Sequence, residues 1–167
     1  MKTKIKFIAL CIMGVFLLSS ANVLAQKANF TGTWTLNEGK SNLGDSPFRG
    51  SLKITATQDV NALNLVRMSK GRDDEDRTTN EKYALDGSES QNTIFQNFVR
   101  KSKSAWSADG KTLTINSVMN FERDGEKSEF KSSEAWSLSG DGKSLTIESN
   151  MNTPNGDIKQ TKIYDKM

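Results

Sequence analysis

Few residues in this chain are equipped for catalysis. Its 167 residues include no histidine and a single cysteine, Cys11. The sequence therefore excludes Ser-His-Asp and Cys-His hydrolysis, histidine-based zinc or iron sites, and haem ligation through histidine. An enzyme would have to build its site from Glu134, a lysine and a tyrosine, and no spacing points to such a site. We therefore predict a protein that is not an enzyme and that uses no catalytic residue, cofactor or metal.

The densest cluster of charge is the segment GRDDEDR, residues 71–77. A calcium site would need oxygen ligands at spaced positions around a glycine turn, and this run lacks the EF-hand spacing. We therefore expect a solvated hairpin tip, with a calcium site as the alternative.

Glu134 is the acidic residue whose position is most informative. Strand alternation places it on the same face as Phe130, Trp136 and Leu138, where an unpaired carboxylate would be costly. It therefore pairs with an inward Lys, Arg or Tyr83, or it contacts a polar group of a ligand. A register shifted by one residue would instead turn it outward.

The elements that position these residues are short alternating runs separated by turn sequences. The period is two from residue 30 onward, with no sustained period of 3.6, which predicts an all-β domain. The turn sequences ADGK, RDGE, GDGK and PNGD each place Asp or Asn before a glycine, as hairpins require. Candidate strands lie near residues 30–37, 51–58, 62–69, 77–85, 98–107, 111–121, 127–139, 143–152 and 157–165, and 91–97 adds a short strand or a covering loop.

An open sheet of this size would leave two exposed edges and an uncovered apolar face. Closure solves both problems, so we predict a single antiparallel up-and-down β-barrel of about 8–9 strands. Such a barrel has room inside for side chains or for one small ligand. A two-sheet sandwich is the alternative.

The sequence WSADGKTLTI, residues 106–115, recurs as WSLSGDGKSLTI, residues 136–147. Each copy contains an aromatic strand end, a glycine turn and an alternating strand, and the second turn holds two extra residues. No nucleophile, base or metal ligand recurs in it. We interpret the repeat as a hairpin module used twice in one sheet.

The first 25 residues differ in composition from the rest. Lys2, Lys4 and Lys6 precede the apolar stretch FIALCIMGVFLL, and VLA precedes Gln26. This pattern predicts a signal peptide cleaved after Ala25, with an uncleaved anchor as the alternative. The barrel domain would then span residues 26–167, exported to the periplasm or secreted, with no transmembrane segment and no cysteine.

Removal of the signal peptide would also balance the charge. The chain has 23 basic and 20 acidic residues, and the first 25 residues contain three lysines and no acid. A neutral mature protein gives no electrostatic reason to bind nucleic acid or an anionic membrane surface.

The stretch NFTGTWTLNEGKSNLG opens the predicted domain. Its Gly32 and Trp34 resemble the first-strand Gly-x-Trp signature of lipocalins and their fatty-acid-binding-protein relatives. Together with KYALDG and the repeated hairpins, the chain resembles small secreted bacterial lipocalin-like (calycin-type) β-barrel proteins. The resemblance implies that Gly32 permits a tight turn and that Trp34 packs across the closed end of the barrel. The chain lacks the mid-chain Thr-Asp-Tyr element and the late arginine of typical lipocalins, and Lys162 could cover Trp34 only imperfectly.

We predict a non-enzymatic barrel that binds a small apolar or amphipathic ligand in its interior. Trp106 and Trp136 would stack on the ligand or fill the barrel. The alternative is an envelope-associated interaction module or hydrolase inhibitor that acts through residues 39–50 and 70–77 and whose partner the sequence does not identify. The residues predicted to line the ligand site are Trp106, Ile115, Met119, Phe121, Phe130, Ser132, Glu134, Trp136 and Ile147.

Overall fold

A computed structural model describes residues 26–44, 50–71, 74–94, 98–123, 126–153 and 156–167, and it leaves the side chains of 121–127 undescribed. The predicted signal peptide, residues 1–25, lies outside the described residues, as do parts of the segments 39–50 and 70–77. The elements are β1 (Gly32–Leu36), a short 3-10 helix η1 (Glu38–Lys40), β2 (Lys53–Gln58), β3 (Ala62–Lys70), β4 (Asp76–Ala84), β5 (Glu89–Thr93), β6 (Val99–Trp106), β7 (Thr112–Arg123), β8 (Glu126–Leu138), β9 (Ser144–Thr153) and β10 (Gly156–Lys166).

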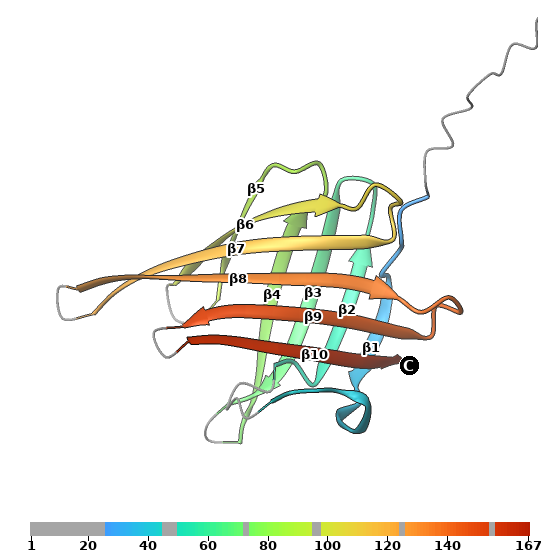
Figure 1. Ribbon diagram of the computed structural model, residues 1–167, viewed down its shortest axis with the longest axis horizontal. Coiled ribbons are helices and arrows are strands. Elements are labelled where there is room, and N and C mark those ends of the chain that lie inside the picture. Colours follow the sequence, from blue (N-terminus) through green and yellow to red (C-terminus); the bar gives the residue numbers. More distant parts are fainter. Residues whose placement is uncertain (1–25, 45–49, 72–73, 95–97, 124–125, 154–155) are drawn as a thin grey trace, which may run out of the picture.

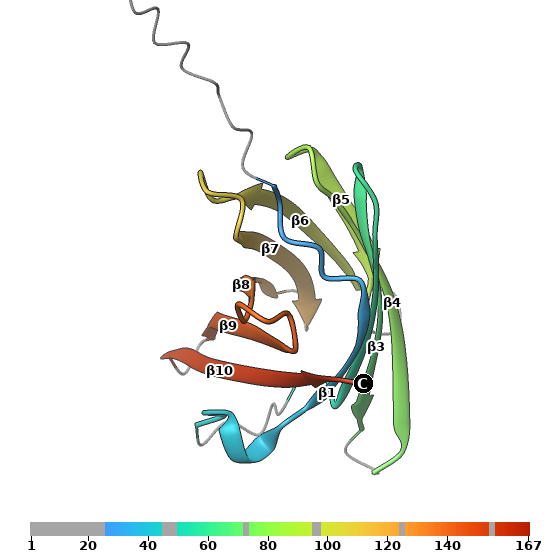
Figure 2. The ribbon, with the colours of Figure 1, turned by 90° about the vertical axis from the view of Figure 1, so that its right-hand side faces the viewer.

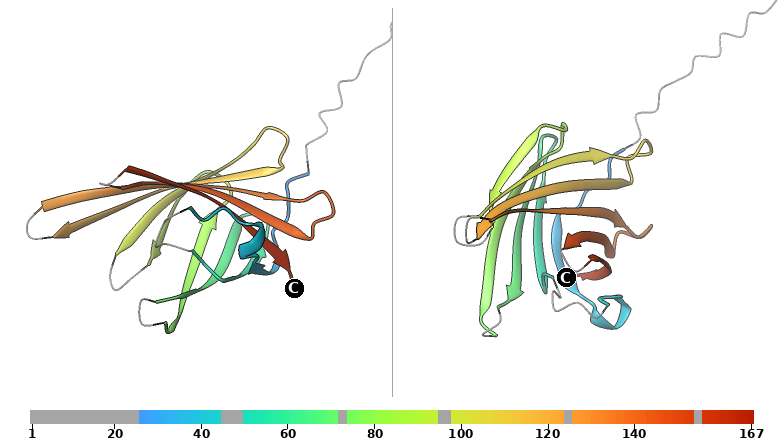
Figure 3. Two further views of the ribbon diagram at one scale, coloured as in Figure 1. Left: turned by 60° about the horizontal axis from the view of Figure 1, so that its bottom comes forward. Right: turned by 60° about the vertical axis from the view of Figure 1, so that its left-hand side comes forward.

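The ten strands form one antiparallel sheet in the order β4-β3-β2-β1-β10-β9-β8-β7-β6-β5. The sheet curves into a nearly closed barrel in which β6–β10 cross β1–β4 at a steep angle (Figure 1). Seen from the side, the two groups of strands face each other across the interior (Figures 2 and 3). The prediction of an all-β antiparallel barrel is confirmed.

The strand count exceeds the prediction of about 8–9 because of β5, which overlaps the start of the stretch 91–97, for which the sequence predicted either a short strand or a covering loop. Its sequence, ESQNT, is polar throughout and gives no apolar alternation from which a strand could be recognised. It nevertheless pairs with β6 from Glu89–Lys103 to Thr93–Val99.

Side chains join the two edges of the sheet, β4 and β5. Asn92 accepts a hydrogen bond from the Lys82 backbone N–H at 2.7 Å and donates to the Lys82 carbonyl at 3.1 Å. Ser90 Oγ accepts from the Ala84 N–H at 2.7 Å. The barrel is therefore closed here by side chains in place of a backbone ladder, which satisfies the edge groups of β4.

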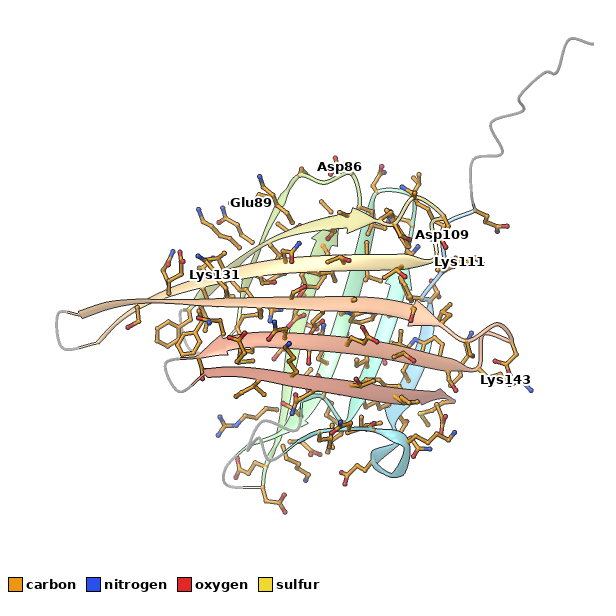
Figure 4. All side chains as sticks on the ribbon, in the orientation of Figure 1. Asp86, Glu89, Asp109, Lys111, Lys131 and Lys143 are labelled. Carbon is orange, nitrogen blue, oxygen red and sulfur yellow. The ribbon has the colours of Figure 1, made fainter. Side chains whose placement is uncertain are left out.

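The repeated sequences form the same turn twice. In the first, Ser107 Oγ donates to Asp109 at 2.6 Å, and Asp109 accepts from the Lys111 N–H. The second turn repeats these bonds with Ser139, Asp141 and Lys143. Gly110 in the first turn and Gly142 in the second both have positive φ. Figure 4 shows Asp109, Lys111 and Lys143 at the same end of the molecule.

The two tryptophans of the repeat are not equivalent. Trp106 is the last residue of β6, whereas β8 continues for two residues beyond Trp136. The two extra residues of the second copy therefore lengthen β8, so that Trp136 lies two residues before the end of its strand. Trp136 is fully buried, while Trp106 is half-buried and stacks on Phe30 with ring centroids 5.9 Å apart.

The apolar core surrounds Trp34 and Trp136. The Trp34 indole N–H donates to the Phe30 carbonyl at 2.9 Å. Lys166 covers the Trp34 ring at 5.2 Å, in the position for which the sequence offered only Lys162 as an imperfect substitute. The largest fully buried side chains are Trp34, Trp136, Tyr83, Tyr164, Phe30, Ile54, Leu63, Leu65, Leu113, Ile115, Leu145 and Ile147.

Candidate functional site

A cavity of about 830 Å³ lies beside this core, within the range of ligand-binding cavities. Strands β3, β4, β8, β9 and β10 contribute most of its wall. Its charged residues are Arg67, Lys70, Arg77, Arg100, Lys162, Glu38, Asp74, Glu81 and Glu134. Its apolar and aromatic residues are Leu52, Ile94, Ile147, Met151, Ile158 and Tyr164, and most of the rest carry hydroxyl or amide groups.

Strand alternation explains why charged groups border the apolar core. On β3, Leu63 and Leu65 are buried in the core and Arg67 follows on the same face. On β10, Tyr164 is in the core and Lys162 precedes it on that face. Each strand therefore runs from the core into the polar part of the interior.

Glu81 is the centre of a buried hydrogen-bonded network. Its side chain is only 3% exposed, and it accepts from Arg67 Nε at 2.9 Å and from Arg100 at 2.8 Å. The Tyr83 hydroxyl donates to it at 2.7 Å and accepts from Arg100. Burial raises the pKa of Tyr83, so this hydroxyl remains a neutral donor.

Glu134 belongs to the same network, with a side chain that is 23% exposed. It accepts from Arg67 at 2.7 Å and from the Trp136 indole N–H at 2.9 Å. Burial raises the pKa of this carboxyl, but the charge and hydrogen bond of Arg67, the charge of Arg100 and the Trp136 hydrogen bond together lower it to about 2. Glu134 is thus ionised and paired, as one of the two sequence interpretations required.

Arg67 connects the two carboxylates and packs its guanidinium over the Trp136 ring at 5.2 Å. Burial lowers its pKa, but Glu134 and Glu81 more than compensate and raise it above the ordinary value. The two arginines and two carboxylates of the network balance in charge, and together they form a polar boundary to the core.

Lys162 is the buried cation that this network leaves without a carboxylate. Only 8% of the residue is exposed. Among the described residues its ammonium forms no salt bridge, and its hydrogen bond goes to Ser149 Oγ at 3.2 Å. Burial and the charge of Arg67 lower its pKa, while Glu134 raises it, with a net lowering. Both Lys162 and Ser149 line the cavity.

The structure brings some of the predicted site residues to the cavity and others to the core. Ser132, Glu134 and Ile147 line the cavity. Ile115 and Trp136 are fully buried in the core. The side chain of Phe121 lies outside the described residues. Trp106 lies at the core edge, and Met119 and Phe130 are half-buried neighbours across β7 and β8; these three do not belong to the described cavity lining.

Sequence reasoning missed the residues Arg67, Glu81, Arg100 and Lys162. The signal was present: Leu63 and Leu65 fix the inward face of β3, and the same parity turns Arg67 inward. A charged residue at the end of an apolar alternation is, however, usually a solvated one. Their partners lie on other strands: Glu81 is on the strand that follows Arg67, whereas Glu134 is 67 residues from Arg67.

Comparisons with known proteins support the fold. No family model matches the sequence, and no curated protein matches it. Among solved structures, the zebrafish ileal bile acid-binding protein complexed with cholic acid has a similar fold, with a TM-score of 0.55 and 13% sequence identity. The match covers 84% of this chain and 100% of that chain. It supports the calycin-type barrel that the sequence resemblance implied.

No helix in the described part of the chain has the length and hydropathy needed to span a membrane.

Proposed function

We propose that this protein is an exported, non-enzymatic carrier of a small amphipathic acid, which it binds inside the barrel. The observation that carries the proposal is the cavity of about 830 Å³ with Lys162 buried in its wall and unpaired with any carboxylate among the described residues. A buried cation is costly alone, and an anionic ligand group would compensate it.

The arrangement of the wall favours a ligand with both polar and apolar parts. Ile147 precedes Ser149 on β9 and lies opposite Lys162 on β10, so apolar and polar contacts adjoin. Farther along the same two strands, Met151 and Ile158 form an apolar pair. We propose that the acid group binds at Lys162 and that the apolar part packs on these side chains, with ligand hydroxyls at the serines of the wall.

The structural neighbour is consistent with this class of ligand. That neighbour is a bile acid-binding protein complexed with cholic acid, and cholic acid is a hydroxylated amphipathic carboxylic acid. In the present chain, the charged residues of the cavity wall support a similar class of ligand.

Equilibrium titration tests the proposal with octanoate, cholate and neutral octanol as probes, read by tryptophan fluorescence and calorimetry on residues 26–167. We expect both acids to bind. Lys162→Met should weaken the binding of octanoate by about tenfold or more, because a charge-assisted hydrogen bond contributes roughly 1.5–3 kcal/mol. The same substitution should leave the affinity for octanol unchanged.

The matched control is Lys103→Met, which removes an exposed lysine of β6 and should not change either affinity. Absence of binding by all three probes, or equal loss in both variants, would contradict the proposal.

A further inference from the structure

Burial lowers the pKa of Lys162, and the charge of Arg67 acts in the same direction against the opposing charge of Glu134, so the neutral amine is more accessible than in an exposed lysine. Arg67 and Arg100 balance Glu81 and Glu134, so the proton on Lys162 is the excess charge of this part of the interior. Loss of that proton leaves this group of five side chains without net charge. Desolvation and a neighbouring cation such as Arg67 are conditions under which lysine acts as a nucleophile.

The position of the amine is also fixed by its neighbours. Gly50 has a φ of +79°, and a Cβ at this position would lie 2.8 Å from Lys162 Cε. On the other side, Ser149 Oγ accepts a hydrogen bond from Nζ at 3.2 Å. The side chain is therefore held between Gly50 and the Ser149 hydroxyl, and all three residues line the cavity.

We propose that Lys162 captures small amphipathic aldehydes as imines, which makes the cavity a covalent as well as a non-covalent binding site. This inference rests on the proposed function in one respect, that the cavity admits small molecules. The ligand class differs, because a carbonyl carbon reacts with the amine whereas a carboxylate pairs with the ammonium.

The reaction is balanced without an oxidant or reductant. The lone pair of Nζ forms a bond to the aldehyde carbon, and one amine proton moves to the former carbonyl oxygen to give a carbinolamine. The C–O bond then breaks and the second amine proton leaves with that oxygen as water. The product is the imine, with C=N in place of C=O.

The test uses octanal as the probe on residues 26–167, at limiting aldehyde, with cyanoborohydride to reduce the imine to a stable secondary amine. Intact mass and peptide mapping then measure the rate of labelling at each lysine. We expect Lys162 to be labelled at least about tenfold faster than exposed lysines, since binding in the cavity raises the local aldehyde concentration. Octanoate should slow this labelling by competition.

Two variants and a calorimetric measurement of octanoate binding distinguish the possible outcomes. Lys162→Arg retains the charge and should abolish the fast label, while Lys103→Met should leave it unchanged. If octanoate binds by calorimetry but Lys162 is labelled no faster than exposed lysines, the imine inference is wrong and the proposed function stands. If neither octanoate nor octanal enters the cavity, both are wrong.

Discussion

Replacing Glu134 by glutamine tests whether the buried network stabilises the barrel. The substitution keeps the shape of the side chain but removes the charge that pairs with Arg67 at 2.7 Å. Lowering the pKa of Glu134 from 4.5 to about 2 corresponds to about 3 kcal/mol in favour of the ionised form in the folded protein. The loss should be of this size, because Arg67 also keeps a buried charge with one carboxylate fewer.

The assay is urea unfolding at neutral pH, followed by tryptophan fluorescence, with the free energy of unfolding extrapolated to water. Glu134→Gln should lower it by about 3 kcal/mol. The control is Glu129→Gln, which removes an exposed partner of Lys131 and should cost less than about 0.5 kcal/mol.

The stabilisation by Glu134 should depend on pH. A folded pKa below the unfolded value contributes stability that is present above pH 4.5 and is lost as pH falls toward 2. The difference between wild type and Glu134→Gln should therefore shrink across this range. A difference below about 0.5 kcal/mol at neutral pH would refute the reasoning, as would a difference that does not change with acid.

Two further substitutions test other parts of the barrel. Gly50→Ala should cost about 1–2 kcal/mol in unfolding experiments and weaken octanoate binding, because the new Cβ meets Lys162 at a positive φ. Gly140→Ala, with open space around it, should be nearly neutral, and equal losses in the two variants would contradict the argument. Asn92→Ala should speed hydrogen exchange at the Lys82 amide by about fivefold or more, because this bond contributes about 1 kcal/mol. Asn116→Ala, at an exposed position, should leave that amide unchanged, and an unchanged rate in both would refute closure by side chains.

The fold could be predicted because most strands show their alternation directly. In β9, Leu145 and Ile147 are buried and Thr146 between them lies on the other face. β5 could not be found this way, since its contribution is made by polar side chains that bond to the backbone of β4.

The candidate site was only partly predictable, for a related reason. Alternation showed that Glu134 faces inward and needs a partner, and Arg67 proves to be that partner. Alternation also marked Ile115 and Trp136 as inward, but it cannot tell a side chain that fills the core from one that lines a cavity. That distinction depends on packing across strands distant in the sequence.

The most direct test of the central claim is a methyl NMR titration of residues 26–167 with octanoate. The claim places the ligand against Ile94, Ile147 and Ile158, which line the cavity, while Ile54 lies in the core and Ile163 belongs to neither set. We expect large shifts at the methyl groups of Ile94, Ile147 and Ile158, and at most small shifts at those of Ile54 and Ile163. Shifts confined to Ile163, or none at saturating octanoate, would contradict binding inside the barrel.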